Sequence, residues 1–96
     1  MTKAKIIETI QNEEARAWME YNRYCWVAAP SDLDYKGVCD WQSEDPNARA
    51  YRSTWAVLHG LIEKLGIDEV DNIDNKEAWD YHSLLYKQAK ENEKTA

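Results

Sequence analysis

The side chains best suited to metal or redox chemistry are few and widely spaced in this 96-residue chain. Two cysteines and two histidines are the candidate ligands for a soft metal ion: Cys25, Cys39, His59 and His82. Zinc modules place such ligands only a few residues apart in pairs, and none of these four has a partner at that spacing. The sequence therefore predicts no metal site and no cofactor.

Catalytic patterns are also missing. A hydrolase needs a nucleophile held beside a histidine, but Ser53 and Ser83 have no recognisable turn around them. An EF-hand register that starts at Asp68 would put Val70 at the third position and Trp79 at the twelfth, where calcium needs a bidentate glutamate. The three glycines form no phosphate-binding loop. We therefore expect a protein that is not an enzyme.

A run of acids is the first feature that favours a function. Carboxylates three residues apart on a helix lie about 5–6 Å apart and can face the arginines or lysines of a partner. A solvated helix start, whose acids favour the positive end of the helix dipole, explains only part of the run. We take the six acids as a predicted partner-binding surface: Asp68, Glu69, Asp71, Asp74, Glu77 and Asp80.

The aromatic residues are the second such feature. The chain has five tryptophans, six tyrosines and no phenylalanine, and tryptophan and tyrosine are enriched at the centres of protein interfaces. We expect Trp55 and Tyr51 to lie in the core, and we predict that Trp26 and Trp41 belong to a binding surface or a dimer contact.

The arginines leave two interpretations open. All four precede the acidic run: Arg16, Arg23, Arg49 and Arg52. The last two could pair with Glu44 or Asp45, which we favour, or they could form a small anion-binding patch.

Three helices must position these residues. The clearest covers residues 46–65, because Asp45 is a good N-cap, Pro46 fits the first turn and Gly66 can end the helix. Its apolar stripe recurs at steps of three and four: Ala48, Tyr51, Trp55, Leu58, Ile62 and Leu65. A first helix over residues 3–28 should stop at Ala29 before Pro30.

The rest of the chain is expected to complete a single domain over residues 1–96. Asp74 and Glu77 have the spacing of a capping box and predict a third helix over residues 75–92, with a frayed tail. Residues 29–45 contain turn signals but also Leu33 and Trp41, so we predict a long ordered loop, either a lid over the helices or a binding loop. The fold class is therefore all-α, a three-helix bundle.

Composition narrows the range of partners. The net charge of −6 argues against direct binding of nucleic acid or of an anionic membrane. We see no signal peptide and no apolar run long enough for a membrane span, so we expect a cytoplasmic protein whose cysteines stay reduced.

The chain resembles the small, acidic, helical accessory proteins of phages and other mobile elements, anti-CRISPR proteins among them. The resemblance rests on the short length, the acidic cluster, the tryptophan and tyrosine content and the helical stretch DPNARAYRSTWAVLHGLIEKLGI. It implies a non-catalytic inhibitor that occupies a basic, nucleic-acid-binding surface of a host protein. Two alternatives remain open, a homodimeric structural or assembly protein and a binder of a small ligand such as a nucleotide.

Overall fold

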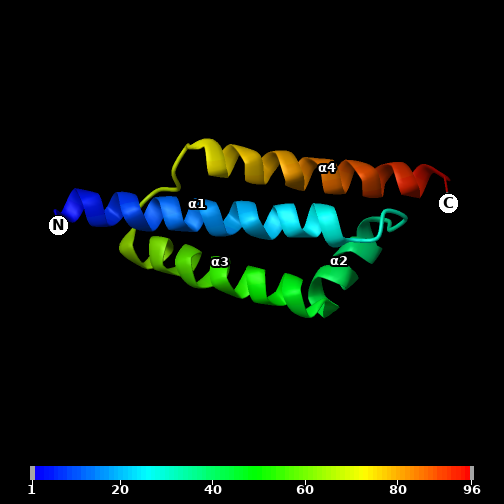
Figure 1. Cartoon of the computed structure of the whole chain (residues 1–96), viewed down its shortest axis with the longest axis horizontal. Helices are drawn as coiled ribbons and strands as arrows, with labels where there is room; N and C mark the ends of the chain where they lie inside the picture. Colours follow the sequence, from blue (N-terminus) through cyan, green and yellow to red (C-terminus); the bar gives the residue numbers. More distant parts are fainter. Residues whose placement is uncertain (1, 96) are drawn as a thin grey trace.

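The computed structural model describes residues 2–95, which form four α-helices and no strand (Figure 1). The helices are α1 (Lys3–Ala28), α2 (Tyr35–Glu44), α3 (Pro46–Leu65) and α4 (Ile73–Thr95). The central helix α1 lies between α3 and α4, and α2 packs against α3 and α4 near the C-terminal end of α1 (Figure 1). The all-α prediction is confirmed, whereas the predicted number of helices is too low by one.

Local signals set the ends of α1 and α3, as predicted. Ala29 is extended before Pro30 and ends α1. The side chain of Asp45 accepts the backbone N–H of Ala48 at 3.0 Å, and Pro46 follows as the first residue of α3. Gly66 adopts φ 66° and ψ 31° at the other end of α3. Backbone hydrogen bonds of 3.2 Å, from residue 66 to residue 63 and from residue 67 to residue 62, complete a Schellman motif.

The prediction of a loop over residues 29–45 is wrong for its second half, which is helix α2. The side chain of Asp34 caps this helix by accepting the N–H of Gly37 at 2.8 Å. Lys36 and Gly37, which are among the predicted turn signals of this segment, therefore lie in the first turn of helix α2. Leu33 and Trp41 pack against the buried cluster, as a covering segment requires, and Val38 is fully buried.

Helix α4 begins earlier and ends later than predicted. The side-chain oxygen of Asn72 accepts the N–H of Asn75 at 2.9 Å, so Asn72 replaces the predicted cap at Asp74. Its amide nitrogen also donates to the side-chain oxygen of Asn12 on α1 at 2.9 Å. Near the C-terminus, Asn92 donates to the carbonyls of residues 31 and 33, both at 2.8 Å. These tertiary contacts hold both ends of α4 in place.

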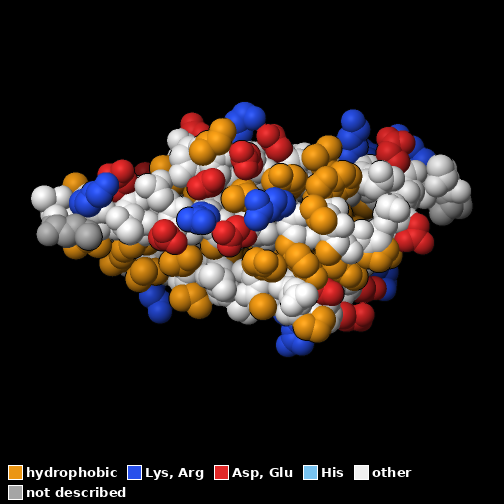
Figure 2. Space-filling model, in the orientation of Figure 1, with side chains coloured by type: hydrophobic (Ala, Val, Ile, Leu, Met, Phe, Trp, Pro, Cys, Tyr) orange, Lys and Arg blue, Asp and Glu red, His pale blue; other side chains and the backbone are white. Residues whose placement is uncertain are grey.

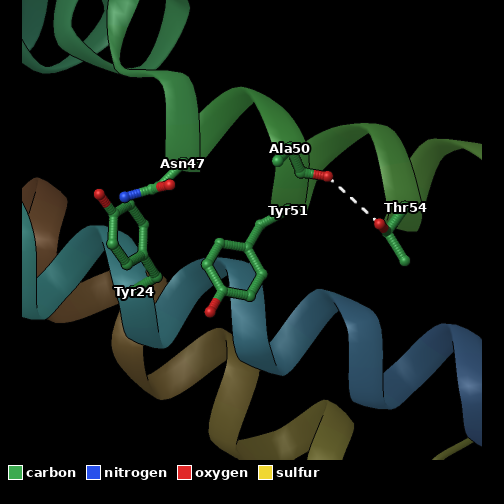
Figure 3. Close-up of a pocket in the computed structure, with 5 residues that line it drawn as sticks. All are labelled: Tyr24, Asn47, Ala50, Tyr51 and Thr54. Carbon is green, nitrogen blue, oxygen red and sulfur yellow. Dashed lines mark hydrogen bonds between the residues drawn. The ribbon is translucent and has the colours of Figure 1, made fainter.

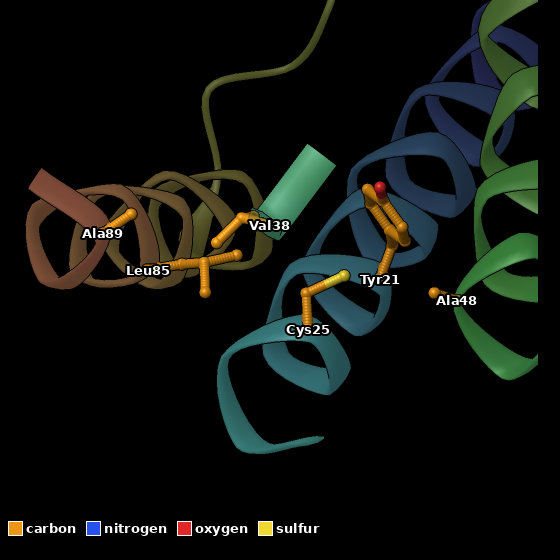
Figure 4. Packing of buried hydrophobic residues seen from close by; sticks show 6 residues of the cluster. All are labelled: Tyr21, Cys25, Val38, Ala48, Leu85 and Ala89. Carbon is orange, nitrogen blue, oxygen red and sulfur yellow. The ribbon is translucent and has the colours of Figure 1, made fainter. Parts of the chain in front are cut away.

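All four helices contribute to one buried cluster (Figure 4). Small residues such as Ala48 and Ala89 let the helices approach closely, while Leu85 and Val38 fill the space between them. The cluster consists of Tyr21, Cys25, Val38, Ala48, Leu85 and Ala89.

None of the helices in residues 2–95 has the combination of length and apolarity that a membrane span requires.

The predicted stripe of α3 is only partly buried. Ala48 and Ile62 are 0% and 3% exposed, whereas Tyr51 and Leu65 are 38% and 53% exposed. The reason is that α3 has only α1 and α2 as its main neighbours, so part of its apolar surface has nothing to pack against.

Candidate functional site: an acidic edge and an acid–histidine cluster

Five of the six predicted acids are exposed in one region, which we call the acidic edge. It comprises Asp68, Glu69, Asp71, Asp74, Glu77 and Asp80, and only Asp74 is half-buried. Residues 66–72 connect α3 to α4 and are tied to α1, because the side chain of Gln11 donates to the carbonyl of Asp68 at 2.9 Å. Lys76 is the one lysine or arginine among residues 2–95 that pairs with these acids, and it lies 3.1 Å from Asp80. The edge therefore carries a net negative charge beside the start of α4.

Trp79 is the exposed tryptophan of this region. Its side chain is 49% exposed, although its ring lies 5.6 Å from that of Trp18 on α1. A cavity of about 200 Å³ lies beneath it, lined by Glu14, Trp18, Trp55, Glu69 and Trp79. The acidic edge thus contains an aromatic ring that a partner can contact, and sequence reasoning did not select it.

Trp26 and Trp41 lie elsewhere. Both are partly buried and pack against the buried cluster near α2. Trp26 is fourteen residues along α1 from Asn12, the residue that contacts the acidic edge, which corresponds to about 21 Å of helix. The structure therefore does not bring these two tryptophans together with the predicted acids.

A cluster of three carboxylates and one histidine adjoins the acidic edge. On α3, the ring Nε2 of His59 lies 3.0 Å from Glu63 Oε1. The other ring nitrogen, Nδ1, lies 3.6 Å from Glu14 Oε1 on α1 and 3.6 Å from Glu69 Oε1 on the connecting segment. Glu14 is only 3% exposed, and the indole N–H of Trp55 donates to its Oε1 at 2.7 Å. Stacking of Trp55 on His59, with ring centroids 4.7 Å apart, fixes the plane of the imidazole.

The other histidine lies in an aromatic environment. The ring of His82 lies against that of Tyr86, with centroids 4.6 Å apart and planes tilted by 45°, and burial lowers the pKa of His82 below its ordinary value. Within residues 2–95, no hydrogen bond joins either histidine to a serine or a cysteine. The described residues therefore show no nucleophile–base pair.

Two of the arginines lie beside each other without a carboxylate partner. Arg16 pairs with Glu20 at 3.3 Å, but within the described range neither Arg49 nor Arg52 has an acid within 4.0 Å. The favoured pairing with Glu44 or Asp45 is therefore wrong. Both arginines line a surface cavity of about 450 Å³, together with Cys39, Gln42, Ser43, Ser53 and Tyr86.

A shallow hollow of about 390 Å³ lies between α1 and α3 (Figure 3). The rings of Tyr24 and Tyr51 lie 5.1 Å apart in it, and the hydroxyl of Thr54 donates to the carbonyl of Ala50 at 3.2 Å. Tyr24 also donates to Asp45 Oδ2 at 2.7 Å, and this hydrogen bond lowers the pKa of Asp45. Among the described residues, tyrosine is the only ionisable type that lines this hollow.

Both cysteines are free thiols. Cys25 is completely buried in the core, and burial raises its pKa.

Comparison of the chain with family models, with curated proteins and with solved structures gave no match.

Proposed function

We propose that this protein is a non-catalytic binding protein whose acidic edge occupies a basic surface of a protein partner. The observation that carries this proposal is the half-exposed Trp79 among the exposed carboxylates of the edge. Exposed carboxylates steer a basic partner and set the association rate, while a tryptophan supplies contact area and a face for a cationic side chain. Binding through Trp79 and the acids involves no chemical reaction, which fits a non-catalytic role.

The partner's basic surface is of the kind that normally grips phosphates, so occupation of that surface would inhibit nucleic-acid binding. This is the mode of action that the resemblance to anti-CRISPR-like accessory proteins implies. We further propose that the protein acts in the cytoplasm, where the thiols of Cys25 and Cys39 remain reduced. The partner is a protein and not nucleic acid, because the net charge of the chain is −6.

The test compares two triple charge reversals that change the net charge equally. One reverses three exposed acids of the edge to lysine, Asp68, Asp71 and Glu77; the control reverses Asp32, Glu44 and Glu91, which lie outside it. The partner is first captured from host cells with the wild-type chain and identified by mass spectrometry. Its association with each variant is then followed by surface plasmon resonance at several salt concentrations.

We expect the edge reversal to slow association strongly and to remove its salt dependence, while the control keeps both. Trp79→Ala should speed dissociation, whereas Tyr35→Ala, a change at a 58% exposed ring outside the edge, should not. Nucleic acid that the partner binds should compete with the wild-type chain. Equal association rates for the two triple variants would contradict the proposal.

A second candidate function, homodimeric assembly, is favoured by the surface of α3. Val57, Leu61 and Leu65 recur every fourth residue and are 73%, 39% and 53% exposed. Apolar side chains gather along the lower border of the molecule in Figure 2, where α3 lies in the same view. A second copy could cover this stripe with its own α3. Sedimentation of the wild type and of Leu61→Glu would test the assembly, and a strictly monomeric wild type would eliminate it.

A further inference from the structure

The tautomer of His59 is set by Glu63. These residues are four apart on α3, and Nε2 lies 3.0 Å from Glu63 Oε1, an ion-pair distance. A neutral imidazole has one N–H, and a carboxylate only accepts. We place the proton of a neutral His59 on Nε2, the ring nitrogen nearer to a carboxylate, so that Nδ1 presents a lone pair.

That lone pair faces two further acceptors. Nδ1 is buried, has no hydrogen-bond partner among residues 2–95, and lies 3.6 Å from an oxygen of Glu14 and from an oxygen of Glu69. The side chain of Glu14 is only 4% exposed, so water cannot compensate its charge fully. Three electron-rich atoms thus lie within 4.8 Å of one another, and a positive charge between them stabilises such an arrangement.

We propose that Glu14, His59 and Glu69 bind one divalent transition-metal ion, with Zn²⁺ as the ion of best fit. The three donor atoms lie within 4.8 Å of one another. Bonds of about 2.1 Å at tetrahedral angles separate two zinc ligands by about 3.4 Å, close to the 3.6 Å from Nδ1 to each carboxylate oxygen. Imidazole with carboxylates suits zinc, whereas Ca²⁺ and Mg²⁺ prefer a larger set of oxygen ligands.

The surroundings of the three donors resemble those of a metal ligand set in a second respect. Metal-binding histidines usually donate their other ring N–H to a carboxylate, and Glu63 occupies that position for His59. Glu14 is itself oriented by the indole N–H of Trp55. With three protein ligands, the ion would keep one position for water or for a ligand atom from a partner.

The ligands come from three parts of the fold. Glu14 belongs to α1, His59 to α3, and Glu69 to the segment that carries the first acids of the edge. A bound ion would therefore fix this segment against the two helices. It would use one of the six edge acids and leave five for a basic partner, so it is compatible with the proposed function and does not depend on it.

The experiment titrates chelator-treated protein with Zn²⁺ by isothermal titration calorimetry. We expect one ion per chain. His59→Gln should abolish saturable binding, and Glu69→Gln should weaken it at least about tenfold. Glu63→Gln, which removes only the orienting carboxylate, should weaken it about 10–100-fold. His82→Gln and Glu77→Gln, matched changes at residues outside the cluster, should bind Zn²⁺ as the wild type does.

Two further measurements keep the result interpretable. Glu69 is 49% exposed on a connecting segment, so its variant should fold, and circular dichroism checks the fold of every variant. Nitrogen NMR of the His59 ring in chelated protein should show one protonated ring nitrogen, and Zn²⁺ should shift the signal of Nδ1. The proposal is overturned if the wild type shows no saturable Zn²⁺ binding, if His59→Gln binds as the wild type does, or if both ring nitrogens carry protons and Zn²⁺ leaves them unchanged.

Discussion

The substitution Val38→Ala tests whether α2 is an integral part of the core. Val38 is 1% exposed and is the buried side chain of α2. The change removes two carbon atoms, and a loss of about 0.8 kcal/mol per buried methylene gives about 1.6 kcal/mol. The cavity left behind increases this to about 2–3 kcal/mol. For a domain of this size, that lowers the melting temperature by about 8–24 °C.

The matched control is Val27→Ala on α1, where the same two carbons are removed from a side chain that is 76% exposed. We expect a change of less than about 0.5 kcal/mol in its free energy of unfolding. Urea denaturation followed by far-ultraviolet circular dichroism measures both variants. Equal stability of the two variants would refute the reasoning, because residues 35–44 would then not contribute to the core. Loss of hydrogen-exchange protection in α2 alone, with unchanged global stability, would refute it as well.

Two further predictions concern backbone conformation and alkaline pH. Gly66→Ala should destabilise the protein by about 1–2 kcal/mol, because residue 66 has φ 66°. Gly60→Ala should instead stabilise it by about 0.4–1 kcal/mol, since an added Cβ there has open space around it. Urea denaturation measures both changes. Burial raises the pKa of Tyr86 to about 12 from 10.0. Folding therefore favours the protonated phenol, and the stability that Tyr86 provides is complete below pH 10 and is lost as the pH rises toward 12. Tyr86→Phe should reduce that loss, as unfolding free energies measured across this pH range would show.

Local chemistry explains which helices could be predicted. The ends of α3 depend on Asp45, Pro46 and Gly66, which act on backbone groups within a few residues, so their effect can be read from the sequence. Helix α2 is short, and its stability depends on the burial of Val38 between distant helices. The Asn72 cap of α4 also depends on a tertiary contact, since the side chain of Asn72 bonds to that of Asn12 on α1.

The candidate sites also differ in whether they depend on local sequence or on tertiary packing. The acids of the edge are neighbours in the sequence, so their proximity could be predicted, whereas the environment of Trp26 and Trp41 depends on how α1 and α2 pack. The acid–histidine cluster joins residues 14, 59 and 69, and no spacing rule connects them. One signal was present in the sequence, because Ile7, Ile10 and Ala17 share one face of the first helix and Glu14 interrupts that face. A charged residue on a buried face calls for a partner, and here the candidate partners lie on other elements.

Because Glu14 is buried, a substitution at this residue distinguishes a structural role of its carboxylate from a role in binding a cation. Gln in place of Glu14 keeps the shape, and its side-chain oxygen can still accept the N–H of Trp55. If the carboxylate is retained for a cation, Glu14→Gln should stabilise chelator-treated protein, because it removes a buried charge. In Zn²⁺ at about 100 times its dissociation constant, the wild type should gain about 2.7 kcal/mol and the variant little, so that the order of stability reverses. Urea denaturation with and without Zn²⁺ measures both orders. A variant that is less stable than the wild type without metal would mean that a proton on His59 already compensates Glu14, and the carboxylate would then serve the fold and not a bound ion.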